Sequence, residues 1–230
     1  MATNTLSILK PSVNNLAARV FVRAAGLDFE EVDVFGNKED PDFVAKDPST
    51  LTPFLEEEGL PKGGLWESCA IMQYLANKHG LSDFYPTDPA ERAMVDSAMF
   101  YLVGTIYPLV ARATYPTLGF PQYAGEVATS EAADDAMKAK AAEDAAEALA
   151  MPLEAFRKHF LDGRRFIGGD KPSIADIRLA VTLEFMDSID YELPTWAREH
   201  SEAVESALGD AYSEPAAEVR GFVASVKSPA

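Results

Sequence analysis

The spacing of hydrophobic positions along the first 80 residues predicts an alternation of short strands and helices. Apolar residues at positions 16, 20, 24 and 27 recur at helical intervals, so we expect a helix that closes near Gly26. Residues 28–35 alternate between polar and apolar and predict a strand. Taken together, the patterns predict strands at 5–9, 28–35, 53–58 and around 65–66, with helices at 16–27 and 67–78 and one helical turn at 42–46. This order is typical of a thioredoxin-like domain spanning residues 1–82.

Residues 80–89 predict a linker, and the periodicity beyond them is helical. Asp88 before Pro89 is typical of a helix start, and Gly168 to Pro172 interrupts the helical pattern. Ser173 followed by Asp176 provides an N-cap with an acid at the third helical position. We therefore expect a second domain, residues 90–230, that is an all-helical bundle with helices at 90–112, 130–161, 173–189, 195–208 and 215–226.

The stretch from 50 to 76 contains two features that suit a small acidic peptide. Pro53 stands at the entrance of a short strand, where an X-Pro bond can be cis and turn the backbone of Thr52 outward. Glu67 and Ser68 stand at the start of a predicted helix, where amide N–H groups and the helix dipole favour a carboxylate. Ordinary helix capping would also explain Glu67 and Ser68.

This combination resembles the glutathione site of the cytosolic glutathione transferases. The run from Glu67 to Leu75 is among that family's specific signatures, and residues 166–176 are similar to the capping motif of its helical domain. The segments 85–95 and 104–107 resemble the theta, delta and epsilon branch, which uses a serine. The resemblance extends from Leu6 to Val223. It implies glutathione as co-substrate, a homodimer and a cytoplasmic role in detoxification.

A thiol that titrates near roughly 8.5 must be held as thiolate for this chemistry. Ser12 lies after the first strand and before the first helix, and it matches the serine of the branch. Its hydroxyl could hold the thiolate or cap the helix, and the N–H donors of Asn14 or Asn15 are alternatives. The first loop contains no tyrosine or cysteine, which excludes the other thiol-activating modes. Cys69 is better explained as a packed thiol.

The resemblance also implies the remaining contacts. Thr52 would offer its backbone to the cysteinyl unit of glutathione, Glu67 would pair with the γ-glutamyl ammonium and Ser68 with its carboxylate. The basic residues placed to meet the glycyl carboxylate are Lys38 and Lys46. The electrophile pocket is expected between the domains, and its candidate residues are Phe100, Tyr107, Arg112, Tyr115 and Phe120. Aromatic residues at helical spacing also suit a bundle core.

Composition narrows the function further. The formal net charge of −17 argues against nucleic acid as a partner, because phosphate binding needs clustered Lys and Arg. One cysteine and three scattered histidines offer little to build a metal site, and a single cysteine suits a reducing cytosol. No apolar run approaches the roughly 20 residues that span a bilayer, so we expect no membrane segment. The N-terminus carries no signal-peptide pattern.

Two departures from the family pattern keep a second function open. Val13-Asn14-Asn15-Leu16 replaces the usual Pro-Cys-Arg segment, and Cys69 stands where an arginine is common. A missing guanidinium would cost roughly ten- to a hundredfold in glutathione affinity. We therefore expect an enzyme that transfers the glutathione sulfur to a small hydrophobic electrophile. The alternative is a non-catalytic module of the same fold that binds ligands or proteins.

Overall fold

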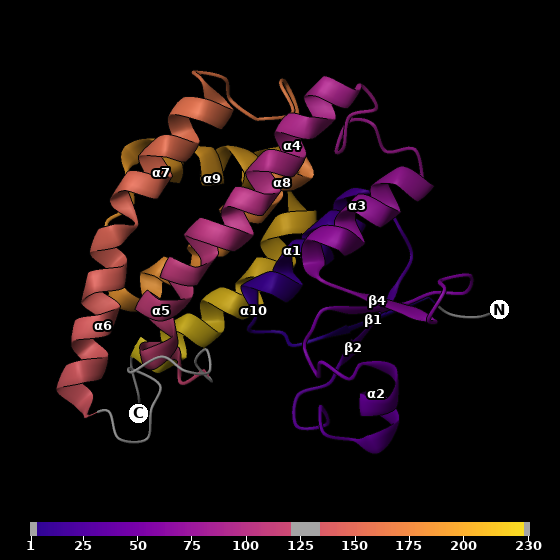
Figure 1. Cartoon of the computed structure of the whole chain (residues 1–230), viewed down its shortest axis with the longest axis horizontal. Coiled ribbons are helices and arrows are strands. Elements are labelled where there is room, and N and C mark those ends of the chain that lie inside the picture. The colour runs from indigo at the N-terminus through magenta and orange to yellow at the C-terminus, as the bar shows by residue number, and fades with distance from the viewer. Residues whose placement is uncertain (1–3, 121–133, 228–230) are drawn as a thin grey trace.

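A computed structural model describes residues 4–120 and 134–227 (Figure 1). The N-terminal part follows the predicted order of strands and helices. Its elements are β1 (Thr5–Ile8), α1 (Val13–Ala24), β2 (Glu30–Asp33), α2 (Pro41–Lys46), β3 (Phe54–Glu56), β4 (Gly64–Trp66) and α3 (Ser68–Lys78). In Figure 1, α1 and α3 lie above the strands and α2 lies below them. The prediction of a β-α-β-α-β-β-α domain is confirmed.

The sheet has the strand order β2-β1-β3-β4. β1 pairs in parallel with β2 and antiparallel with β3, and β3 pairs antiparallel with β4. In this register Ser7 lies opposite Phe54, which in turn lies opposite Trp66. The end of β1, the start of β3 and the end of β4 therefore meet at one end of the sheet.

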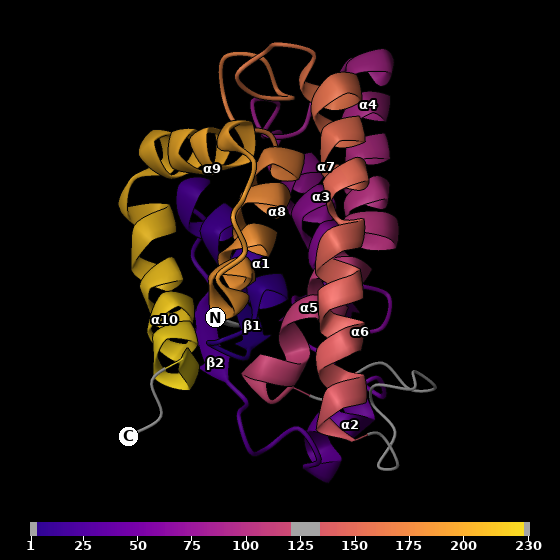
Figure 2. The ribbon, with the colours of Figure 1, turned by 90° about the vertical axis from the view of Figure 1, so that its left-hand side faces the viewer.

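The C-terminal part is helical, as predicted. Its elements are α4 (Pro89–Tyr101), η1 (Leu102–Ile106), α5 (Tyr107–Leu118), α6 (Asp135–Ala148), α7 (Ala150–Phe156), η3 (Arg157–Leu161), α8 (Ile174–Leu183), η4 (Glu184–Ile189), α9 (Thr195–Leu208) and α10 (Asp210–Lys227). Figure 2 shows α6 and α7 along one side of this bundle and α9 and α10 along the other. α8 lies between them and packs against α1, α4 and α9.

Several predicted helix boundaries were wrong. The helix expected at 90–112 continues to Leu118 through the π-helical turn η1, and neither Pro108 nor Pro116 ends it, because α5 packs closely against α6. α8 ends at Leu183 and gives way to a 3-10 turn up to Ile189. α10 begins at Asp210, so that Pro215 lies inside the helix. Of the helix predicted at 130–161, residues 130–133 lie outside the described residues.

The continuous helical stretch Pro89–Leu118 corrects the expectation that no segment is apolar enough to span a bilayer. By length and composition alone it is apolar enough to cross a bilayer, with a mean hydropathy of 1.4 over its most apolar window. Core helices of helical bundles meet the same criterion. Here α4 packs against α8, and α5 packs against α6 and η4.

The expected cap of α8 is present as a complete capping box. The Ser173 side chain accepts from the Asp176 N–H, and the Asp176 carboxylate accepts from the Ser173 N–H and hydroxyl at 2.8 and 2.7 Å. The same buried carboxylate also accepts from the N–H groups of Ile167 and Gly168, at 2.9 and 3.3 Å. One acid therefore joins the start of α8 to the glycine turn before it.

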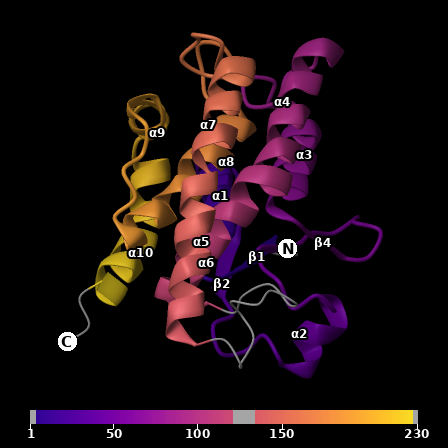
Figure 3. The same cartoon turned by 60° about the vertical axis from the view of Figure 1, so that its left-hand side comes forward.

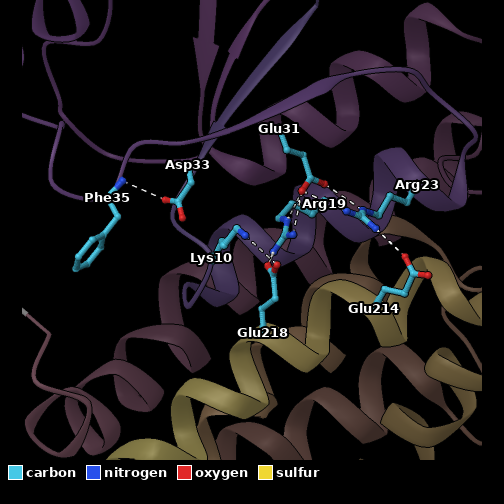
Figure 4. A network of polar contacts seen from close by, with 8 residues as sticks. All are labelled: Lys10, Arg19, Arg23, Glu31, Asp33, Phe35, Glu214 and Glu218. Atoms are coloured by element: carbon cyan, nitrogen blue, oxygen red, sulfur yellow. Dashed lines mark hydrogen bonds and ion pairs between the residues drawn. The ribbon is translucent and has the colours of Figure 1, made fainter.

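A network of charges joins the two domains (Figure 4). Arg19 of α1 is almost fully buried and bonds to Glu31 at 2.9 Å and to Glu218 of α10 at 2.7 Å. Arg23 forms ion pairs with Glu31 at 3.0 Å and with Glu214, also on α10, at 3.1 Å. Together with the packing of α1 against α8 and α10, these ion pairs fix the domains relative to each other.

Candidate functional site

Three loop segments converge at the end of the sheet where β1 stops. The first is the loop before α1, the second contains Pro53 and the third is the start of α3. The strand register brings them together, since Ser7, Phe54 and Trp66 lie side by side. A direct contact also joins the first turn of α1 to the second segment, because the Asn15 amide donates to the Thr52 hydroxyl at 3.0 Å.

Ser12 is the N-cap residue of α1, but its side chain forms no capping hydrogen bond. It is only partly buried, and the first turn of α1 carries no acidic residue. The positive end of the helix is therefore not neutralised by a nearby carboxylate of that turn. A hydroxyl at this point can donate to an anion.

The two asparagines that were alternatives to Ser12 are both engaged elsewhere. Asn14 donates to the Tyr107 hydroxyl at 2.6 Å and accepts from Arg178 at 2.6 Å. Asn15 is fully buried, and its amide nitrogen donates to Thr52. Each of these side chains therefore joins structural elements.

The Thr52–Pro53 peptide bond is cis, as we expected from the sequence. Thr52 precedes β3 and has no hydrogen-bond partner for its main-chain N–H or C=O among the residues that the structure describes. Main-chain groups without a partner can pair with an extended peptide in the manner of an added strand. This backbone can therefore receive a short peptide.

Glu67 and Ser68 occupy the start of α3. Glu67 is exposed and has a φ of 71°, in the left-handed region that residues with a Cβ rarely adopt. Its side chain forms no capping hydrogen bond, so simple capping does not explain it. Ser68 is 5% exposed and begins the helix, whose first turn has no acidic residue. This helix end can bind a carboxylate.

The basic residues predicted for the glycyl carboxylate differ in their surroundings. Lys46 forms an ion pair with Glu56 at 2.8 Å, and this hydrogen bond raises the pKa of its ammonium. Lys38 is half-buried in the turn before α2. Of the two lysines, Lys46 therefore already has a carboxylate partner within the protein.

Cys69, where an arginine is common, is a half-buried free thiol. Burial raises the pKa of this thiol, although the nearby Arg178 acts in the opposite direction. A thiol with a raised pKa is a poor nucleophile at neutral pH. This agrees with the expectation of a packed thiol.

The residues predicted to line the electrophile pocket are only partly brought together. The hydroxyls of Tyr107 and Tyr115 lie 2.5 Å apart, and the Tyr115 ring meets Phe120 edge-on. Phe120 in turn stacks on Phe222 of α10, so it belongs to an aromatic cluster between α5 and α10. Phe100 is 71% exposed on α4. This exposure suits neither the wall of a pocket nor a core residue.

Sequence reasoning missed Arg178, which lies beside the candidate site. It is 1% exposed on α8, bonds to Asn14 and Thr182, and its guanidinium lies 4.9 Å from the centre of the Tyr107 ring. Its signal in the sequence is one cation inside the apolar run 174–183. Such a residue indicates a buried polar contact whose partner the sequence does not identify.

A separate groove of about 470 Å³ lies in the helical domain, between α5, α6 and the end of η4. Its lining residues include four alanines and the acids Glu143, Glu147, Asp190 and Glu192. It shares no residue with the predicted electrophile pocket. Among the residues described by the structure, no three His, Cys, Asp or Glu side chains gather to hold a metal ion.

Comparison with known proteins identifies the family. The model of the glutathione S-transferase N-terminal domain matches residues 5–77, and that of the glutathione S-transferase C-terminal domain matches residues 139–211. The chain is 27% identical over 186 residues to glutathione S-transferase D6 of Drosophila melanogaster, covering 79% of this chain and 77% of that one.

Solved structures agree with this result. A Bombyx mori glutathione transferase is 26% identical and superposes with a TM-score of 0.76 over 98% of both chains. Human glutathione S-transferase T1-1 is 21% identical and shares the fold, with a TM-score of 0.80 over 97% of this chain and 95% of that one. Since the two family models together match more than half of the chain, in the order and at the domains described above, this protein belongs to the glutathione S-transferase family.

Proposed function

We propose that this transferase uses Ser12 to hold the sulfur of glutathione as a thiolate, which then attacks a small hydrophobic electrophile. The observation that carries this assignment is the meeting of Ser12, cis-Pro53 and the start of α3 at one end of the sheet. The Ser12 hydroxyl forms no cap, whereas Asn14 and Asn15 both donate to other side chains. A hydroxyl donor near a helix N-terminus favours the charged form of the thiol.

In this proposal the tripeptide lies along the three segments. Thr52 pairs with the cysteinyl main chain, Glu67 meets the γ-glutamyl ammonium, and Ser68 with the first amides of α3 binds the γ-glutamyl carboxylate. Lys38 is the better candidate for the glycyl carboxylate, because Lys46 is paired with Glu56. The sulfur then lies near Ser12, and the electrophile would approach from the side of Tyr107 and Tyr115.

Catalysis in such a site consists of two effects. Stabilising the thiolate raises the fraction of the reactive form, and holding both reactants together removes much of the entropic cost of their encounter. The thiol proton passes to solvent and the sulfur forms a bond to carbon. In a displacement the leaving group departs with the electron pair of its bond, and in an addition the π electron pair of the double bond shifts to the neighbouring atom, which then takes a proton from solvent. Conjugation makes a hydrophobic electrophile more polar, which fits a cytoplasmic detoxification role.

A homodimer is part of the same proposal. Leu51, Trp66 and Phe100 are large apolar side chains that are 59%, 41% and 71% exposed. They belong to the loop before β3, to β4 and to α4, and Figure 3 shows α4 beside α3 on the side of the molecule from which the β3–β4 hairpin extends. A second copy packed on this face would cover them. Sedimentation of the wild type and of Phe100→Glu tests this, and a wild-type monomer at micromolar concentration would refute it.

Calorimetric titration with glutathione tests the proposed function. We expect saturable binding that Glu67→Ala weakens roughly tenfold or more, because a charge-assisted contact is lost. The matched control is Glu58→Ala, an exposed acid in the β3–β4 turn. Binding that is absent at millimolar glutathione, or unaffected by Glu67→Ala, contradicts the proposed site.

A further inference from the structure

The groove between α5, α6 and the end of η4, which we call the α6 groove, has apolar walls. Ala142, Ala146 and Ala150 line it from α6 and the start of α7, and these small side chains leave its space open. Ile189 and Tyr191 line it from the end of η4 and the loop that follows. Its volume of about 470 Å³ lies within the range of roughly 300–1,000 Å³ that is usual for small-molecule sites. The groove therefore has the size and the walls of a site for a small apolar molecule.

Acidic side chains line the same groove from two elements. Glu143 and Glu147 stand four residues apart on α6, so they lie on the same face of that helix. Asp190 and Glu192 come from the end of η4 and the loop after it. Four like charges around an apolar surface repel one another, and the apolar surroundings screen this repulsion less than water does. The α6 groove therefore has a negative potential.

The cations of the chain compensate only part of this charge. Asp190 pairs with Lys227 at 2.6 Å, and Glu143 with Lys140 at 3.6 Å. The other two acids, one on each of the two elements, form no ion pair or side-chain hydrogen bond within the described part of the chain. The remaining segments of the sequence contain no lysine or arginine. The groove therefore retains negative charge that a bound cation would neutralise.

Tyr191 adds an aromatic ring to these walls. It is partly buried, and burial raises the pKa of its hydroxyl, so the ring stays uncharged at neutral pH. An uncharged aromatic ring attracts an organic cation through its quadrupole, which is how quaternary ammonium groups are bound. A metal ion would instead need several converging oxygen ligands, and no such group of side chains occurs among the residues with described positions.

We propose that the α6 groove binds a small hydrophobic organic cation, such as a lipophilic ammonium or phosphonium ion, at a site separate from the glutathione seat. The apolar groups of the cation replace water on the alanines, and its charge lies near Glu147, Glu192 and the Tyr191 ring. The groove shares no residue with the predicted electrophile pocket. This inference does not depend on whether the seat binds glutathione.

Tetraphenylphosphonium and tetraphenylborate test the inference, because the two ions have nearly the same size and shape but opposite charge. Equilibrium dialysis of the full-length protein against each ion measures binding. We expect one saturable site per chain for the cation, with an affinity that falls as salt is added, and at least roughly tenfold weaker binding of the anion. Equal binding of the two ions, or no saturable binding of the cation, would overturn the inference.

Two pairs of substitutions separate the charge of the groove from the net charge of the protein. Glu147→Gln combined with Glu192→Gln removes the two uncompensated carboxylates and should weaken binding of tetraphenylphosphonium roughly three- to thirtyfold. Glu199→Gln combined with Glu202→Gln makes the same change in net charge at exposed positions of α9, none of which lines the groove. This control pair should leave the affinity within about twofold of the wild type. Equal effects of the two pairs would show that only net charge matters and would contradict the site.

Two further measurements locate the bound probe. Ala146→Phe fills the groove with a ring and should lower the affinity at least roughly tenfold. A folded Ala146→Phe variant that binds as the wild type does would place the probe elsewhere. Should that variant fail to fold, Tyr191→Leu decides, because loss of the ring should weaken binding about two- to fivefold while the wall stays apolar. S-hexylglutathione should not displace the probe, and complete displacement would place the probe in the electrophile pocket and overturn the inference.

Discussion

Glu67 holds an unfavourable backbone conformation at the start of α3. Its φ of 71° is one of four positive values at non-glycine residues among those described, and the others are Thr50, Asp162 and Asp190. Residues with a Cβ remain in such conformations only where the surroundings hold them, often at ligand sites. Thr50 lies in the loop before cis-Pro53, so two of the four border the proposed glutathione seat. The seat therefore has a cost in stability at the level of single residues.

Glycine at position 67 should separate stability from binding. We expect Glu67→Gly to be about 1 kcal/mol more stable than Glu67→Ala, because glycine adopts a positive φ without steric cost. Both variants lose the carboxylate, so both should bind glutathione more weakly than the wild type. Urea unfolding gives the stabilities and calorimetry the affinities. Equal stability of the two variants would show that the conformation is not strained.

Among the helices, the acids that cap the starts of α4 and α8 differ in burial: Asp88 is the N-cap residue of α4, whereas Asp176 is the third residue of the capping box of α8. Asp88 caps α4 at the surface by accepting from two N–H groups, whereas Asp176 is fully buried and accepts four hydrogen bonds. An exposed cap can be replaced by water, but the partners of a buried carboxylate cannot reach water. The capping box of α8 is therefore a structural element of the bundle.

This difference predicts unequal costs of substitution. Asp88→Ala should lower the free energy of unfolding by about 1 kcal/mol, as is usual for an N-cap. Asp176→Ala should lower it by roughly 3 kcal/mol or more, because several buried donors lose their partner. Thermal and urea unfolding of both variants measures this. A cost for Asp176→Ala no larger than that for Asp88→Ala would contradict the role assigned to the buried carboxylate.

The elements were predictable from the sequence where local patterns decide them. The succession of strands and helices along the N-terminal domain and the capping box at Ser173 follow from spacing and capping chemistry. The end of α5 and the start of α10 were not predicted, because Pro116 lies inside the first helix and Pro215 inside the second, whereas a proline in a sequence usually indicates a helix break. Whether α5 continues past position 112 depends on its packing against α6, which a local pattern does not contain.

Only those parts of the candidate site that local sequence motifs mark were predictable from the sequence. Pro53 stands out in the sequence because it opens a short strand, and Glu67 and Ser68 stand out because they precede an apolar run with helical spacing. Choosing between Ser12 and the two asparagines required the long-range partners Tyr107, Thr52 and Arg178. Contacts separated by 37 to 164 residues leave no mark in a single sequence.

At the scale of the whole molecule, the net charge of −17 makes the acidic residues repel one another, and the ion pairs of α1 counteract this repulsion locally. Burial alone would raise the pKa of Glu31, but its hydrogen bonds from Arg23 and Arg19 outweigh burial and lower it. The pKa of Glu218 is lowered against burial by Arg19 and Lys10. The contacts of α1 with β2, through Glu31, and with α10, through Glu218, are therefore strongest where these carboxylates are ionised.

Acid should loosen this contact. In the unfolded chain both carboxyls titrate near about 4.3, above their folded values, so the unfolded state binds more protons in that range. The stabilisation is complete above the unfolded pKa and is lost as the pH falls through the folded pKa. We expect Glu218→Gln to be less stable than the wild type at pH 7, with a gap that closes below about pH 4.

The exposed Glu202 on α9 supplies the control, because Glu202→Gln removes the same charge without an ion pair described for it. Unfolding by urea at several pH values measures both variants. A gap between Glu218→Gln and the wild type that is independent of pH would show that the Arg19–Glu218 pair contributes no electrostatic stability.

The pKa of the thiol of bound glutathione, followed by the ultraviolet absorbance of the thiolate, tests the central claim most directly. For the wild type we predict a value below the roughly 8.5 of a free thiol, because the Ser12 hydroxyl and the start of α1 favour the anion. Ser12→Ala should return it toward that value while glutathione still binds. An unchanged pKa in Ser12→Ala would contradict the assignment of Ser12 as the residue that holds the thiolate.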